Sequence, residues 1–122
     1  MQNFRDLKVW QKAHETALAI YRASASFPTD ERFGLTSQLR RAAVSVPANI
    51  AEGTLRSSDA DFARFLHIAL GSAGEVDYYL LLARDLKFID PDKHSTLDAS
   101  LQEVKRMLAA LVTRVKQDAK TA

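Results

Sequence analysis

The last third of the chain carries the most regular pattern in the sequence. Its apolar residues alternate between spacings of four and three, at Leu97, Leu101, Val104, Leu108, Leu111 and Val115. A stripe with this period runs along one face of an α-helix. Such a helix gains most of its stability by packing that stripe against other elements. The pattern therefore requires partner helices elsewhere in the chain.

Three further segments have the same helical period. They are separated by turn-forming stretches at Phe27–Asp30, Gly53–Ser58 and Phe88–Pro91. We expect helices at about residues 6–26, 35–52, 59–87 and 91–117. Long helices joined by short connections are typical of an antiparallel up-down-up-down bundle. The sequence thus predicts an all-α four-helix bundle that occupies residues 1–122 as a single domain.

The predicted helix ends carry capping residues. Ser58 followed by Asp61 resembles a capping box at the start of the third helix. Asp90 before Pro91 is typical of an N-cap followed by proline at the first helical position. Gly53 is expected just past the end of the second helix, where a left-handed residue is favoured.

Pro47 falls inside the predicted second helix. Proline has no N–H, so it removes the hydrogen bond to the Ala43 carbonyl, and its ring crowds the preceding turn. We therefore expect the second helix to be kinked at Pro47.

The sequence offers little material for a catalytic site. It has no cysteine, which excludes a disulfide framework, a thiolate zinc site and a cysteine nucleophile. It has no Glu-x-x-His motif of the kind that holds metals in helical bundles. Its three histidines are spread over three predicted helices. We therefore predict no catalytic residue, no metal and no cofactor, in a protein that is not an enzyme.

The chain also lacks the marks of a membrane or secreted protein. No uninterrupted apolar run is longer than the six residues from Tyr78 to Ala83, far short of the roughly 20 residues that a membrane span needs. The N-terminal segment has no apolar core of the kind found in signal peptides. We expect a cytoplasmic protein without membrane partners.

Some apolar residues are left over once each helix has one inner stripe. The densest surplus is on the third helix, at Tyr78, Tyr79, Leu81 and Leu82. A second apolar face favours a partner surface. The alternative is that these residues are scattered on the surface, as single apolar residues often are. We interpret the cluster as a candidate interface for self-association.

The charged residues leave two interpretations open. The net charge is only +2, from 17 basic and 15 acidic residues. Arg40 and Arg41 either form a partly buried ion pair with Glu75, or form a basic patch with Arg56. Arginine suits phosphate recognition because its planar fork donates two parallel hydrogen bonds. The tail of the fourth helix carries five basic residues, at Lys105, Arg106, Arg114, Lys116 and Lys120.

Three stretches carry a recognisable signature. The first helix opens with FRDLKVWQKA from Phe4, and the second contains QLRRAAVSVPANIAEG from Gln38 to Gly53. The third has Phe65-Leu66 and Ala69-Leu70-Gly71-Ser72 with Glu75. Over about residues 4–90 the chain resembles the four-helix-bundle proteins first noticed as open reading frames in intervening sequences of bacterial 23S ribosomal RNA genes.

This resemblance implies a homopentamer with a central channel. It also implies kinship with the accessory variability protein of diversity-generating retroelements, which pairs with a reverse transcriptase and binds nucleic acid through basic residues. By that resemblance the candidate nucleic-acid-binding residues are Arg40, Arg41, Arg56, Lys12 and Arg22. Arg40, Arg41 and Lys12 lie within the shared stretches, whereas Arg22 rests on its charge alone.

Two functions follow as hypotheses. The first is a non-enzymatic oligomer that binds RNA or DNA mainly through phosphate contacts, with little sequence specificity. Few aromatic residues stand near the arginines in the sequence, so base stacking has little support at this level. The alternative is a protein-interaction scaffold with no nucleic-acid role, whose partner is a reverse transcriptase or another protein.

Overall fold

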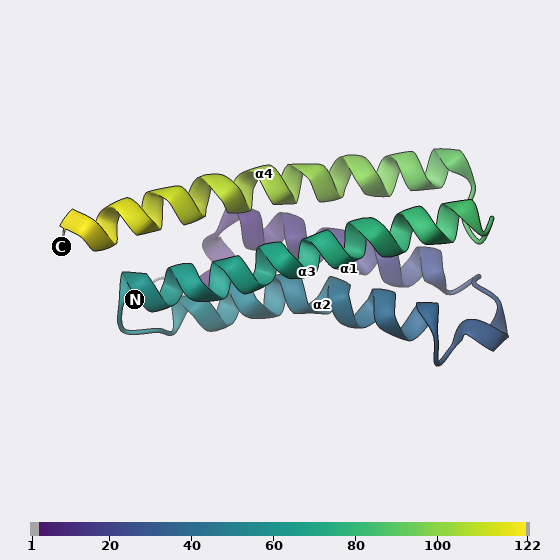
Figure 1. The fold of residues 1–122 in the computed structure, drawn as a ribbon, viewed down its shortest axis with the longest axis horizontal. Helices are drawn as coiled ribbons and strands as arrows, with labels where there is room; N and C mark the ends of the chain where they lie inside the picture. The colour runs from purple at the N-terminus through teal and green to yellow at the C-terminus, as the bar shows by residue number, and fades with distance from the viewer. Residues whose placement is uncertain (1–2, 122) are drawn as a thin grey trace.

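The computed structural model describes residues 3–121 and contains only helices over that range. Two short 3₁₀ turns, η1 (Phe4–Asp6) and η2 (Thr29–Glu31), accompany four long helices. These are α1 (Lys8–Ser24), α2 (Leu35–Thr54), α3 (Asp59–Asp85) and α4 (Pro91–Thr121), shown in Figure 1. The predicted all-α four-helix fold is confirmed.

The helices form a ring in chain order. Each helix packs against the next, and α4 closes the ring against α1. Two contacts show that α1 and α4 are antiparallel. Thr16 of α1 is hydrogen-bonded to Ser100 of α4, and Lys12, one turn earlier on α1, forms an ion pair with Glu103, which lies later on α4. Moving back along α1 thus means moving forward along α4. Figure 1 shows successive helices running in opposite directions along the long axis of the molecule.

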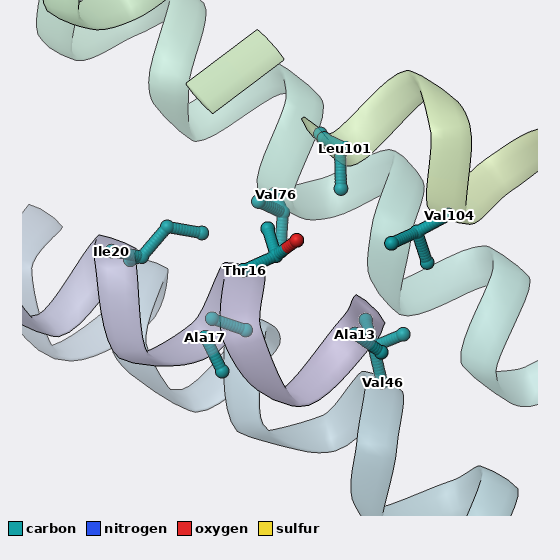
Figure 2. Close-up of a pocket in the computed structure, with 9 residues that line it drawn as sticks. Ala13, Thr16, Ala17, Ile20, Val46, Val76, Leu101 and Val104 are labelled. Atoms are coloured by element: carbon teal, nitrogen blue, oxygen red, sulfur yellow. The ribbon is translucent and has the colours of Figure 1, made fainter. Parts of the chain in front are cut away.

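All four helices contribute to one apolar core. The largest fully buried side chains are Ile20, Leu39, Ile50, Leu66, Val76, Leu80, Leu101, Val104 and Leu108. The contribution of α1 is the smallest in volume, because Ala13, Thr16 and Ala17 face inward there. Figure 2 shows these three side chains directed toward α2, α3 and α4 around a small central cavity.

The first helix begins later than the sequence suggested. Residues 4–6 form η1, and Leu7 is extended, with φ −75° and ψ 124°. Leu7 is buried, and the bend that it makes carries its side chain into the core before α1 begins at Lys8. α1 also ends earlier, at Ser24, because the chain turns to pack the ring of Phe27 against Phe88 at 5.7 Å between centroids. The other three helices start where the sequence predicts, and their ends differ by two to four residues.

Gly53 does not cap α2, and that prediction is wrong. It lies in the last turn of α2, and no glycine in residues 3–121 has a positive φ. A Cβ at Gly53 would lie 2.8 Å from Cδ1 of Phe62 and 3.1 Å from Cβ of Phe65. Glycine stands here because the backbone of α2 passes directly against the aromatic rings of α3.

The left-handed residue that ends a helix is Lys87, with φ 65°. The Phe88 N–H donates to the Ala83 carbonyl at 2.8 Å, and the Lys87 N–H donates to the Arg84 carbonyl at 2.9 Å. These two bonds form the Schellman motif that terminates α3. The turn brings Ile89 into the core at the start of the connection to α4.

Both predicted N-caps are confirmed. The Ser58 Oγ accepts a hydrogen bond from the Asp61 N–H at 3.1 Å at the start of α3. The Asp90 Oδ1 accepts one from the Lys93 N–H at 2.7 Å at the start of α4.

Pro47 lies inside α2 and is buried. The helix continues through it from Leu35 to Thr54, and the kink stays a prediction. Near this point the hydroxyls of Ser45 and Ser72 lie 2.8 Å apart, which joins α2 to α3.

A polar contact joins α3 to α4. The Asp77 carboxylate accepts hydrogen bonds from Lys105 Nζ at 3.0 Å and from Gln102 Nε2 at 3.2 Å. Burial opposes ionisation of Asp77, but these bonds and the charges of Lys105 and His94 together lower the pKa of its carboxyl below the ordinary value.

This shift predicts an acid-dependent loss of stability. Because the pKa of Asp77 is lower in the folded chain, its contribution is present above the unfolded pKa of about 4 and is lost as the pH falls through the folded value. We expect the free energy of unfolding to fall more steeply for wild type than for Asp77→Asn between about pH 5 and pH 3. Urea unfolding at several pH values measures this, and parallel curves for the two proteins would contradict it.

Gly53→Ala should destabilise the fold. The new methyl group would collide with Phe62, and overpacking of this kind costs about 1–3 kcal/mol. The control is Gly53→Ala made in a Phe62→Leu background, where the ring that the methyl group would meet has been removed. Thermal unfolding should show that Gly53→Ala lowers the Tm more in the wild-type background than in the Phe62→Leu background. Equal losses in the two backgrounds would show that contact with Phe62 is not the reason for Gly53.

Candidate nucleic-acid interface

Arg40 joins α2 to α1. Its Nε donates to the Ser24 Oγ at 2.8 Å, and its Nη2 donates to the Tyr21 carbonyl at 3.1 Å. Its guanidinium carbon lies 4.7 Å from the centroid of the Tyr21 ring. Arg40 is therefore held against α1, and its partners lie on the end of that helix where free carbonyls accept hydrogen bonds.

The ion-pair interpretation of Arg40 and Arg41 finds no support. Within residues 3–121, no salt bridge joins Glu75 to either arginine. Glu75 is exposed on α3, and Arg41 is exposed on α2. Arg41 therefore remains available to a ligand.

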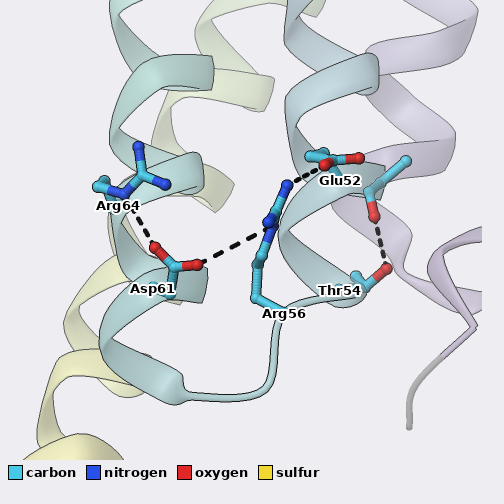
Figure 3. Close-up of polar contacts among 6 residues, drawn as sticks. Glu52, Thr54, Arg56, Asp61 and Arg64 are labelled. Atoms are coloured by element: carbon cyan, nitrogen blue, oxygen red, sulfur yellow. Dashed lines mark hydrogen bonds and ion pairs between the residues drawn. The ribbon is translucent and has the colours of Figure 1, made fainter.

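Arg56 lies in the turn between α2 and α3 and is balanced by carboxylates. Figure 3 shows it between Glu52 of α2 and Asp61 of α3. Asp61 also accepts a hydrogen bond from Arg64 Nε at 2.9 Å. The guanidinium groups of Arg56 and Arg64 each lie 4.5 Å from the ring centroid of Phe65. This cluster holds two cations and two anions, so it is a clamp across the turn rather than a free basic patch.

Lys12 and Arg22 lie on α1 in different surroundings. Lys12 Nζ is 3.5 Å from a carboxylate oxygen of Glu103 on α4. Arg22 is exposed and lines a shallow groove of about 310 Å³ between α1 and α4. The structure thus spreads the five predicted residues over several faces instead of gathering them into one site.

The surface grooves concentrate positive charge. A second groove between α1 and α4, of about 350 Å³, is lined by Lys8 and Arg114. Together with the Arg22 groove and two others, these hollows are lined by nine lysines and arginines and one acidic residue, Asp6. The nine are Lys8, Arg22, Arg32, Arg40, Arg64, Lys93, Arg114, Lys116 and Lys120.

Sequence reasoning did not single out Lys8, Arg32, Arg64 or Lys93. Lys93 and Arg22 are 71 positions apart in the chain and line one groove. A helical projection of α1 alone places Arg22 on its surface, but it cannot show that a lysine of α4 lies beside it.

The central cavity is not a ligand site. It offers about 10 Å³ to the centre of a water-sized sphere, which is about the room that one water needs. Its lining is apolar apart from Thr16, whose hydroxyl already bonds the Lys12 carbonyl and Ser100.

The candidate interface on α3 divides into two kinds of side chain. Tyr78 is 57% exposed and Leu81 is 37% exposed. Tyr79 and Leu82 are half-buried and pack against the core. Gly71 and Gly74 also lie on α3, and a Cβ on either would meet nothing within 4 Å. The packing within the chain therefore gives no reason for either glycine.

Residues 5–110 match the family described as the 23S rRNA-intervening sequence protein. The chain belongs to this family.

A solved structure is similar to this 23S rRNA-intervening sequence protein over most of its length. It is a protein of unknown function from the S23 ribosomal protein family of Bacteroides thetaiotaomicron VPI-5482. The TM-score is 0.77 at 28% identity, and the alignment covers 85% of this chain and 97% of the other. No curated protein matches the sequence.

Among residues 3–121, no three histidine, aspartate or glutamate side chains gather as they would around a metal ion. Over the same residues, no helix is both long enough and apolar enough to cross a membrane.

Proposed function

We propose that this protein is a non-enzymatic homo-oligomer that binds RNA or DNA through the phosphate backbone. The observation that carries the proposal is the segregation of charge. The chain as a whole is almost neutral, at +2, whereas four of its surface grooves contain nine basic residues and one acidic residue. Hollows lined by one sign of charge raise the local concentration of oppositely charged ligands.

The α1–α4 face supports contact with an extended polyanion. Lys8 and Arg114 line the groove at one end of α1, and Arg22 and Lys93 line the groove at the other. Lys8 and Arg22 are 14 residues apart, which is about 21 Å along a helix. A nucleic-acid strand advances about 3.4 Å per phosphate, so one strand of about six phosphates spans this face.

The originally predicted residues differ in what they can contribute. Arg22 and Arg40 line grooves, and Arg41 is exposed. Lys12 and Arg56 each face a carboxylate, which offsets part of their attraction for phosphate. We therefore assign the main phosphate contacts to Arg41 and to the groove cations other than Arg64, which is bonded to Asp61.

Self-association would multiply these contacts. The proposed interface is the exposed face of α3 with Tyr78, Leu81 and the two glycines, whose missing side chains would let a neighbouring subunit approach closely. The assembly that we propose is a pentamer. Five copies of each groove on one particle would bind a long polyanion more tightly than one copy does.

Removing the groove charges should weaken binding and flatten its salt dependence. The test variant is Arg22→Gln with Lys93→Gln, and the control is Arg84→Gln with Arg106→Gln, which removes equal charge outside the four grooves. Fluorescence anisotropy with a labelled structured RNA over a salt series gives the slope of log K against log salt. We expect the slope to fall by about 1.4–1.8 for the groove variant, at 0.7–0.9 per lost phosphate contact.

Equal slopes for the two variants would show that the groove lined by Arg22 and Lys93 is not part of the binding surface. A wild-type protein that binds neither RNA nor DNA at low salt would refute the proposal and favour the protein-interaction scaffold.

Leu81→Glu should break the oligomer. It would place a carboxylate in an apolar contact, where an unpaired charge is costly to desolvate. Leu55→Glu is the control, because Leu55 is 59% exposed at the end of α2 and lies outside the proposed interface. Light scattering coupled to gel filtration should report a smaller particle for Leu81→Glu only. A full-sized Leu81→Glu assembly would move the interface off this face of α3.

A further inference from the structure

A row of rings lies along the side of α1 that borders α2. The Phe4 and Trp10 rings meet edge to face, with centroids 4.9 Å apart. The Trp10 and His14 rings are stacked at 4.9 Å and are 9° from parallel. Tyr21 continues the row two turns later. We name these four residues, Phe4, Trp10, His14 and Tyr21, the aromatic strip.

An arginine covers a ring at each end of the aromatic strip. The Arg5 guanidinium lies 4.6 Å from the centroid of Phe4, and the Arg40 guanidinium lies 4.7 Å from that of Tyr21. Arg40 reaches the strip from α2, where hydrogen bonds to Ser24 and to the Tyr21 carbonyl fix its position. The strip is therefore a preformed surface of rings with a positive charge at both ends.

The outer part of the strip is open to solvent. His14 is exposed, and Tyr21 is 43% exposed. Leu18, between them on the same side of α1, is 40% exposed, and Val44, one turn after Arg40 on α2, is 44% exposed. These aromatic and aliphatic side chains are thus in contact with water and not covered by the rest of the chain.

We propose that the aromatic strip stacks the unpaired bases of a single-stranded RNA or DNA. This inference rests on the proposed function and names its substrate class. Bases stack on exposed aromatic side chains, and arginine adds cation–π attraction. From Trp10 to Tyr21 the strip extends 11 residues, or about 16 Å, which accommodates about five nucleotides at 3.4 Å each.

The charges at the strip favour a single strand over other occupants. In a duplex the base faces are already stacked on each other and cannot reach the rings. A dry apolar protein partner would bury the guanidinium groups of Arg5 and Arg40 without a counter-charge, which is costly. A single strand supplies both base faces for the rings and phosphates for the arginines.

The only tryptophan of the chain reports directly on this surface. Titration of the protein with a 12-nucleotide oligothymidylate should quench Trp10 fluorescence, because a base would stack on the exposed His14 ring, which itself lies against the half-buried Trp10. A 12-base-pair duplex should bind at least fivefold more weakly and leave the Trp10 fluorescence unchanged. Both titrations use the same low-salt buffer.

Tyr21→Leu is the matched test variant, because leucine keeps apolar bulk and removes the flat ring. Its carbonyl stays in place to accept the bond from Arg40. Phe33→Leu is the control, because the Phe33 ring is 87% exposed, also lies against an arginine, and is outside both the strip and the proposed oligomer interface. Circular dichroism verifies the folding of both variants. We expect Tyr21→Leu to weaken single-strand binding about fivefold or more, whereas Phe33→Leu leaves it unchanged.

The outcomes separate this inference from the proposed function. Equal affinity for duplex and single strand, or single-strand binding that Tyr21→Leu does not weaken, overturns the stacking surface and leaves phosphate binding in place. Absence of binding to either nucleic acid at low salt overturns both.

Discussion

The backbone of α2 passes so close to α3 at Gly53 that a single methyl group would collide with Phe62. This contact closes one end of the helix pair around which the bundle is built. The hydroxyls of Ser45 and Ser72 hold the same pair near its middle. α4 is joined to α3 by the hydrogen bond from Lys105 to Asp77. The positions of α1 and α4, which pack against α2 and α3 and against each other, thus depend on how closely α2 and α3 can pack.

α1 is held by different means, and its surface is correspondingly different. It presents small side chains to the core, and polar contacts such as Thr16 with Ser100 and Arg40 with Ser24 join it to both neighbours. Shallow grooves lie between α1 and α4, and lysines and arginines of both helices line them. The same helix carries the exposed aromatic strip. The proposed phosphate and base contacts therefore both involve α1.

Several arginines have structural partners that do not exhaust their hydrogen-bonding capacity. The guanidinium group has five N–H donors, and Arg40 uses two of them on Ser24 and Tyr21. A ring beneath a guanidinium contacts its face and leaves the edges free. An arginine that is fixed in this way loses little conformational freedom when a phosphate binds at its edge. Arg40 can thus join two helices and contact a ligand, whereas Arg56 already faces Glu52 and Asp61.

The apolar periods by themselves determined the number and type of the helices, and Ser58 and Asp90 determined where α3 and α4 begin. These signals are local, because a helix stripe repeats every three or four residues and a cap acts within one turn. The role of Gly53 was misread because a cap and a close helix contact both call for glycine, and only the position of Phe62 distinguishes them. The grooves and the aromatic strip were decided by tertiary structure. The grooves bring Arg22 beside Lys93, and the strip brings Arg40 over Tyr21. Such pairs depend on how whole helices are rotated against each other, and no short stretch of sequence encodes that rotation.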